Sequence, residues 1–440
     1  MAVRVMLPKV SVHRFSCAPF TNVENYRRLV GGDVIDEIEA LAHALKGARV
    51  CHINSTGFGG GVAELLARLV PLARALGINA DWRLIQGSPE FFRVTKAFHN
   101  ALQGSAYSLS ESDKSIYLQV NRESARLLDD SYDVFVVHDP QPAAFRAAVG
   151  ERGAKWIWRC HIDTSEPNRE VAAFLLPFLE LHDVAVFTMR EFALPGLDAR
   201  RTAFIAPAID PLSTKNMELP DALCLEVIAN AGLDTRRPRV VQVSRFDPWK
   251  DPLGVIDAYR TARREVPGLQ LSLVGSIAGD DPEGWQLLAR VQEETAGDDD
   301  IYVFTNLAGV GSMEVNAFQR AADVVIQKSV REGFGLVVSE AFWKGKPLVA
   351  GRAGGIPMQF PEGHERYLIS SNEELAARVV ELIGDPAQRK AFGAAAREHV
   401  RERFLLPRLL RDELRLIHSV LTGGERRAPP PAAPGAPPKR

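Results

Sequence analysis

Two cations, Arg245 and Lys250, follow an apolar run that predicts a strand over residues 239–244. They would therefore stand at the carboxyl end of that strand, which is the ligand side of an open parallel sheet. A guanidinium fork and an ammonium point charge suit a diphosphate. The alternative is a solvated pair bridged to Asp247 or Asp251, which is the usual fate of surface charges.

Two carboxylates flank a glycine turn further along the chain. Glu332 precedes Gly333-Phe334-Gly335, and Glu340 lies two helical turns into the helix that follows. The turn would expose backbone N–H groups to an anion, while both carboxylates would accept hydrogen bonds from sugar hydroxyls. The alternative for Glu340 is an ordinary exposed glutamate on a helix.

A glycine-rich turn, Gly57-Phe58-Gly59-Gly60-Gly61, separates a predicted strand from a predicted helix. Consecutive glycines let backbone N–H groups approach an anion, toward which the helix directs its positive end. The stretch is neither a P-loop nor a G-x-G-x-x-G fingerprint, which disfavours an ATPase and a nicotinamide enzyme. A tight turn without a ligand is the alternative.

Polar side chains also follow two apolar runs in the first half of the chain. His138 and Asp139 end one run, and Arg159, His161 and Asp163 end the next. A single histidine after a strand is more often structural, but two such clusters on the ligand side of adjacent strands favour a functional site. Metal-ligand spacing such as H-E-x-x-H and a G-x-S-x-G elbow are both absent, so neither a metal site nor an α/β-hydrolase is predicted.

Alternating strands and helices must position these residues. Strands are predicted over 48–54, 82–86, 133–139, 155–162 and 184–188, and then over 239–244, 269–275, 301–305, 323–327 and 347–350. Helices are predicted over 33–45 with Asp33 as N-cap, 62–77, 142–149, 252–265, 282–295, 312–321 and 336–345, with further helical stretches between 90 and 128. The segment 189–237 reads as irregular and rich in proline.

Short strands that are each followed by a helix predict an α/β fold with doubly wound parallel sheets. Two such series predict two Rossmann-like domains, over residues 1–215 with an N-terminal extension and over 216–400. A C-terminal helix over 401–422 would cross back to the first domain, and residues 423–440 form a proline-rich tail expected to be disordered.

Composition limits the classes of partner. Lys plus Arg number 53 against 55 Asp plus Glu, which gives a net charge of −2 and no field to hold nucleic acid or an anionic membrane. Four scattered cysteines without a C-x-x-C pair fit neither a disulfide framework nor a zinc site, so a cytoplasmic protein is expected. Neither a signal peptide nor a membrane-spanning run is visible.

Taken together, these motifs resemble a known family. Arg245 and Lys250, Glu332 and Glu340 around the glycine turn, and Gly354-Gly355 are similar to the retaining GT-B glycosyltransferases that use nucleotide sugars. The stretches 52–64, 138–142, 158–163 and 243–250 are closer still to the trehalose glycosyltransferring synthases within that group. The resemblance covers about residues 20–420 and implies two Rossmann-like domains facing across a cleft.

The resemblance implies transfer of glucose from UDP-, ADP- or GDP-glucose to free glucose, giving α,α-trehalose, with reversal open. It implies reacting-centre roles for Arg245, Lys250, Glu332 and His161. It implies donor contacts from Gly60, Gly61, Asn306, Gly333, Phe334, Gly335, Leu336, Val337 and Glu340, and acceptor contacts from His138, Asp139, Arg159 and Asp163. No cofactor and no metal is expected, and a homodimer is an open alternative.

Two other functions remain open. A retaining trehalose phosphorylase would use inorganic phosphate in place of the nucleotide, and the Arg245/Lys250 pair would serve either anion. A non-catalytic protein that binds sugar nucleotides is the third reading, against which the joint presence of Glu332, His161 and the two cations argues.

Overall fold

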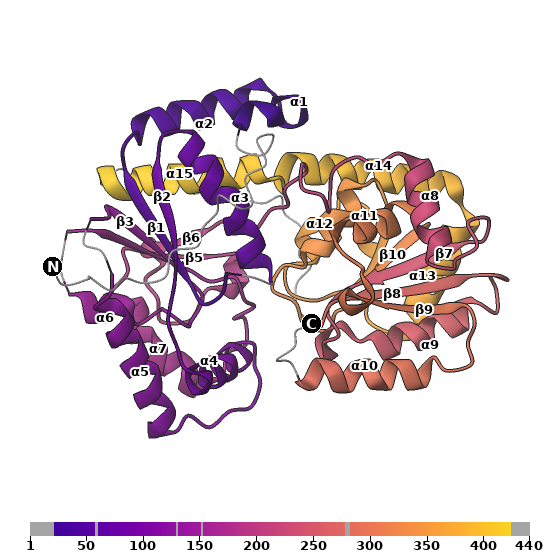
Figure 1. Ribbon diagram of the computed structural model, residues 1–440, viewed down its shortest axis with the longest axis horizontal. Helices are drawn as coiled ribbons and strands as arrows, with labels where there is room; N and C mark the ends of the chain where they lie inside the picture. The colour runs from indigo at the N-terminus through magenta and orange to yellow at the C-terminus, as the bar shows by residue number, and fades with distance from the viewer. Residues whose placement is uncertain (1–21, 58–59, 129–130, 151–152, 278–281, 424–440) are drawn as a thin grey trace. The chain divides into compact units, whose positions relative to one another are not determined.

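The computed structural model describes residues 22–423, apart from residues 58–59, 129–130, 151–152 and 278–281. The chain divides into two compact units (Figure 1): Met1–Ala206 with Leu409–Arg440, and Pro207–Arg408. The first unit ends upstream of the predicted boundary at residue 215, and it includes the C-terminal helix from Leu409 onward. The predicted proline-rich tail lies outside the described residues from position 424.

The first unit contains one parallel sheet of six strands in the order β2-β1-β3-β4-β5-β6. The strands are β1 (Arg49–Asn54), β2 (Asn79–Leu84), β3 (Val134–His138), β4 (Lys155–Arg159), β5 (Val184–Phe187) and β6 (Thr202–Phe204). The helices are α1 (Arg27–Val30), α2 (Gly32–Ala44), α3 (Gly61–Ala75), α4 (Pro89–Leu102), α5 (Glu111–Ala125), α6 (Phe145–Val149), α7 (Arg169–Leu179) and α15 (Leu406–Thr422). Strand order reverses between β1 and β3.

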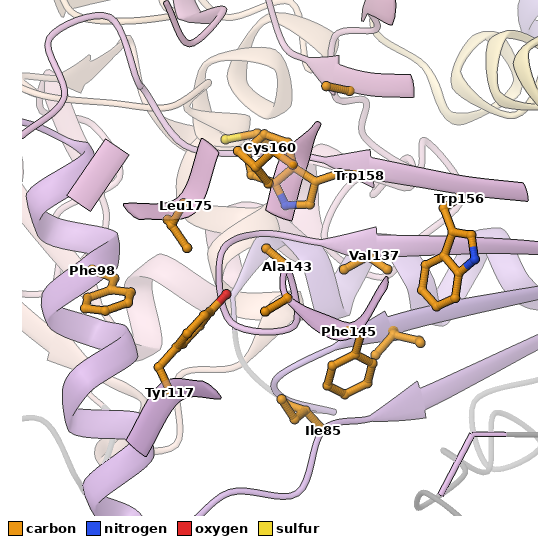
Figure 2. Packing of buried hydrophobic residues seen from close by; sticks show 14 of the residues in the cluster. Ile85, Phe98, Tyr117, Val137, Ala143, Phe145, Trp156, Trp158, Cys160 and Leu175 are labelled. Carbon is orange, nitrogen blue, oxygen red and sulfur yellow. The ribbon is translucent and has the colours of Figure 1, made fainter. Parts of the chain in front are cut away.

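Helices cover both faces of this sheet, with α4 to α7 on one side and α2, α3 and α15 on the other (Figure 1). The α4–α7 side holds a large apolar core that includes Val137, Trp156 and Trp158. Figure 2 shows Tyr117 at the edge of this core with its hydroxyl turned toward Ala143. That hydroxyl donates to the carbonyl of Pro140 at 2.8 Å, so the core also holds the loop that follows β3.

The second unit contains another parallel sheet of six strands, in the order β12-β11-β10-β7-β8-β9. The strands are β7 (Arg239–Val243), β8 (Gln270–Gly275), β9 (Ile301–Thr305), β10 (Val324–Gln327), β11 (Leu348–Gly351) and β12 (Leu368–Ile369). The helices are α8 (Asp221–Asn230), α9 (Pro252–Ala262), α10 (Pro282–Glu294), α11 (Ser312–Ala321), α12 (Leu336–Trp343), α13 (Asn372–Gly384) and α14 (Pro386–Arg403). Here strand order reverses between β7 and β10, which is the doubly wound arrangement.

The predicted fold class is confirmed, and the differences lie in short or polar elements. The segment 189–237 is not wholly irregular, because it contains β6 and α8, and the two-residue β12 was also missed. The helical stretches predicted between residues 90 and 128 are the two helices α4 and α5. Helix α2 begins at Gly32 with Gly31 as N-cap, so Asp33 lies in the first turn and is not the predicted N-cap. In the described part of the chain, no helix combines the length and apolarity needed to cross a membrane.

The C-terminal helix α15 is tied to the first unit by charge. Glu413 pairs with Arg159 of β4 at 3.3 Å, and both side chains are almost fully buried. On the outside, Arg415 donates to Glu37 of α2 at 2.6 Å, where both side chains are partly exposed. A buried and an exposed ion pair therefore attach the same helix to the same unit.

We expect Glu413→Ala to lower the free energy of unfolding of the first unit by about 3–5 kcal/mol, because it leaves the Arg159 guanidinium buried without a counter-charge. Arg415→Ala is the matched control on the same helix, and it should cost at most about 1 kcal/mol. Urea unfolding followed by circular dichroism measures both. Equal losses in the two variants would contradict the assignment of α15 attachment to the buried pair.

Candidate functional site

An ion pair joins the two central strands of the second unit at their carboxyl ends. Lys250 follows β7 and Glu332 follows β10, the neighbouring strands between which the order reverses. The ammonium lies 2.5 Å from Glu332 Oε2, and each side chain is 14% exposed. Ser329 donates its hydroxyl to the same oxygen at 3.2 Å. The strand-order reversal is where an open α/β sheet forms its ligand crevice, so this pair marks the candidate site.

Backbone contacts hold the loop that carries Lys250. The side chain of Gln242 accepts from the N–H of Lys328 and donates to the carbonyl of Lys250, at 3.3 and 3.0 Å. Asp251 has a left-handed φ of 43° and caps α9 by accepting from the N–H of Gly254 at 3.0 Å. Lys328 forms an ion pair with the same aspartate. The loop is thereby fixed from both central strands.

The two predicted cations differ in their partners. Among the described residues, Lys250 pairs with Glu332 while Asp247 and Asp251 pair with Arg245 and Lys328, so the alternative of a simple loop salt bridge fails for Lys250. Arg245 does pair with Asp247, at 3.3 Å, and its side chain is 61% exposed. An exposed pair of this kind contributes little to stability, which leaves the guanidinium available to an anion.

The predicted turn Gly333-Phe334-Gly335 leads into α12, and residues Gly355 and Gln359 hold it by hydrogen bonds. Gly335 has a left-handed φ of 81° and stands as the N-cap of α12. The N–H of Gly355 donates to the carbonyl of Gly333 at 3.2 Å, and a Cβ at position 355 would lie only 2.7 Å from that oxygen. Buried Gln359 donates to the carbonyl of Phe334 at 2.5 Å and accepts from Ser339 at 2.6 Å. Gln359 was not predicted from the sequence, because a lone glutamine carries no motif.

Glu340 is not the exposed helix glutamate that was the alternative, since it is only 3% exposed. Its Oε1 lies 3.4 Å from the ammonium of Lys215, while Oε2 has no hydrogen-bond partner in the described part of the chain. A buried carboxylate oxygen with an unused lone pair is costly unless a ligand satisfies it.

A buried lysine stands behind Glu340. Lys344 donates to Gln319, Asn216 and the carbonyl of Glu340 at 2.7, 3.1 and 3.2 Å. Burial lowers the pKa of the Lys344 ammonium to about 7, an effect that the nearby Glu340 carboxylate opposes. Lys215 and Lys344 were both missed, because neither residue belongs to a motif, although Lys344 lies near the end of the predicted helix that became α12.

Other predicted donor contacts lie along the same edge of the second sheet. Asn306 follows β9, and its side-chain amide bonds both the N–H and the carbonyl of Ile277, at 2.9 and 3.2 Å. Leu336 and Val337 are half-buried in the first turn of α12. Phe334 is buried and packs on Phe404 with centroids 5.4 Å apart, so its ring belongs to the core.

In the first unit, three histidines meet on the side of the sheet opposite the main core. His52 Nδ1 lies 3.1 Å from His138 Nε2, and His138 Nδ1 lies 2.9 Å from His161 Nε2. Burial lowers the pKa of His52 to about 3 and lowers the pKa values of His138 and His161 well below the usual range, with the Arg159 charge contributing to each shift. All three rings are therefore neutral at pH 7.

Asp139 and His161 are joined through the backbone. Asp139 has a left-handed φ of 63°, and its Oδ1 accepts from the N–H of His161 at 2.8 Å. Burial raises the pKa of the Asp139 carboxyl to about 7, while the His161 N–H and the Arg159 charge oppose the shift. A non-glycine residue in this backbone region is uncommon and often marks a functional position.

The remaining predicted residues of this unit have local partners. Arg159 is buried against Glu413, and Asp163 accepts from the N–H and the hydroxyl of Ser165 at 3.0 and 2.6 Å. Gly60 has a left-handed φ of 83° and precedes Gly61, the first residue of α3. Phe58 and Gly59 of the predicted glycine turn lie outside the described residues. Across the residues that the structure covers, no three His, Cys, Asp or Glu side chains are grouped to hold a metal ion.

Comparison with known proteins gives matches in both units. Residues 52–194 match the family described as trehalose synthase, N-terminal domain, and residues 226–399 match glycosyl transferases group 1. Trehalose synthases from Rubrobacter xylanophilus and Pyrococcus horikoshii are 52% and 45% identical, each over 90% of this chain and 96% of the relative. A trehalose phosphorylase from Pleurotus pulmonarius is more distant, at 27% over 86% of this chain and 58% of its own length.

A solved trehalose-6-phosphate synthase shares the fold. It aligns with a TM-score of 0.67 at 16% identity and covers 85% of this chain and 99% of that one. With the two doubly wound sheets, this similarity confirms a GT-B fold.

The neutral histidines predict acid sensitivity of the first unit. A histidine whose folded pKa is depressed binds its proton first in the unfolded state, so stability is lost as pH falls below the unfolded pKa of about 6.5. Below that pKa, each such histidine should lower the free energy of unfolding by about 1.4 kcal/mol for each unit by which the pH falls. Urea titrations between about pH 7.5 and about pH 4.5 measure it, and His52→Phe should flatten the slope by one such increment. An unchanged slope in that variant would contradict a neutral His52.

Proposed function

The chain belongs to the trehalose synthase family, and on that premise we propose that it transfers glucose from a nucleoside diphosphate glucose to free glucose, forming α,α-trehalose. The observation that carries the proposal is the Lys250–Glu332 pair at the strand-order reversal of the second sheet. It holds an ammonium where a diphosphate would leave and a carboxylate where sugar hydroxyls would bind.

The diphosphate is the group whose charge grows in the reaction. Lys250 would meet it as a fixed point charge and exposed Arg245 as a fork that swings from Asp247. Such positioned donors stabilise a departing oxyanion. Glu332 would use its other oxygen for donor-sugar hydroxyls, and the open Oε2 of Glu340 would accept from the ribose.

We place His161 at the donor sugar and Asp139 at the acceptor glucose. A retained anomeric configuration follows from attack on the face from which the phosphate leaves. The bond from the anomeric carbon to the phosphate oxygen breaks, and its bond to the acceptor oxygen forms. The acceptor proton passes to the departing phosphate, so no carboxylate nucleophile is required.

The decisive experiment incubates trehalose separately with UDP, ADP, GDP and inorganic phosphate. Glucose release that needs a nucleotide supports the transferase. Release with phosphate alone would establish the phosphorylase instead, a reading supported by the more distant similarity to a trehalose phosphorylase. In the forward direction, each NDP-glucose is supplied with glucose and the disaccharide is identified.

We expect Lys250→Ala to lower kcat by roughly 10²–10³-fold, because it removes a fixed positive charge from the leaving group. Arg236→Ala is the control, since Arg236 is an arginine of the same unit that is 88% exposed and pairs with its sequence neighbour Asp234. Its kcat should be unchanged. A Lys250→Ala enzyme with the wild-type rate would remove the ammonium from the mechanism.

A further inference from the structure

Three imidazoles form an unbroken chain of nitrogen contacts across the first sheet. His52 lies on β1, His138 ends β3, and His161 follows β4. The His138 and His161 centroids are 5.2 Å apart and the ring planes differ by 17°. With only 2.9 Å between the bonded nitrogens, these rings meet edge to edge, as a hydrogen bond in the ring plane requires.

The three contacting imidazoles allow only a few arrangements of their ring protons. A neutral imidazole carries one N–H and one lone pair, and each nitrogen contact needs one of each. If His138 donates from Nε2 to His52, its Nδ1 must accept, so His161 donates from Nε2 and all three rings are Nε2–H tautomers. If His138 donates from Nδ1 to His161, its Nε2 must accept, and all three are Nδ1–H tautomers. Any mixed set opposes two protons or two lone pairs.

The surroundings keep the three imidazoles neutral. Arg159, paired with Glu413, is a charged side chain near these rings, and the titratable Asp139 accepts from the backbone N–H of His161. The Arg159 charge opposes protonation of every ring, and burial acts in the same direction by lowering each pKa. Both nitrogens of His138 are engaged by neighbouring rings, so His138 has no free nitrogen for the acceptor contact predicted from the sequence.

We propose that His52 and His138 are positioning residues that lock His161 into one tautomer shared by all three rings. His161 would then present a single hydrogen-bonding character at Nδ1, either a lone pair or an N–H, to a sugar hydroxyl. That last step rests on the proposed function, whereas the shared tautomer does not. The buried His52 thus acts on the sugar contact without touching the sugar.

The shared tautomer is tested by ¹⁵N spectroscopy of the full chain labelled at histidine, near neutral pH, with single variants to assign the signals. We expect the ring nitrogens of His52, His138 and His161 to report one common tautomer. A mixed set, or shifts averaged between tautomers, would overturn the proposal. This result is independent of turnover, so it stands or fails separately from the proposed function.

The link to catalysis is tested with His52→Phe, which keeps an aromatic ring at position 52 but removes the nitrogen contact to His138. We expect the tautomer shared by His138 and His161 to change in population, because Nε2 of His138 loses its partner. We expect kcat to fall by roughly tenfold to a hundredfold, with a smaller change in the KM for donor. His182→Phe is the control, because His182 is buried in the same unit but bonds only a backbone carbonyl in the described residues, at 3.1 Å. Should His52→Phe fail to fold, the wild-type spectrum still decides. A folded His52→Phe with an unchanged His161 tautomer and rate would refute the lock.

Discussion

The second unit depends on one ion pair between a lysine and a glutamate. These residues lie in the loops that follow the two central strands, where the strand order reverses. Parallel strands bring their carboxyl ends to one edge, so the loops after β7 and β10 have to meet there. In the absence of a ligand, the Lys250 ammonium and the Glu332 carboxylate balance each other's charge at this point. Neighbouring groups such as Gln242, Gln359 and Lys328 serve to hold those two loops in register.

Both units bury polar groups near the carboxyl ends of their strands. In the second unit, Glu340 is compensated on one oxygen by Lys215, and Lys344 sits behind it among neutral amides. In the first unit, Arg159 is compensated by Glu413, while three imidazoles stay uncharged. The buried charges of Glu340 and Arg159 are therefore each paired, whereas the buried imidazoles are kept neutral by the cost of burying their charged form.

The prediction of fold class succeeded where the signal was strong. The runs ending at Asn54, His138 and Val243 are β-branched and apolar, and each is followed by a helix, so sheet type followed from periodicity. The missed β6, β12 and α8 are short or lie in a proline-containing stretch, where the period is too brief to read. The N-cap at Asp33 was displaced because a glycine with positive φ ends the preceding helix.

The amino-acid order by itself determined which side chains stand at strand ends, because residue type and strand position are properties of the local chain. It therefore identified Arg245, Lys250, Glu332, Asp139 and His161 as candidates, and the glycine turn before a helix identified Glu340. Only the tertiary structure decided their partners: Lys250 with Glu332, Arg159 with Glu413, and His138 between two other histidines. Those pairings join residues far apart in the chain, and no local pattern encodes a contact whose two halves arrive on different strands.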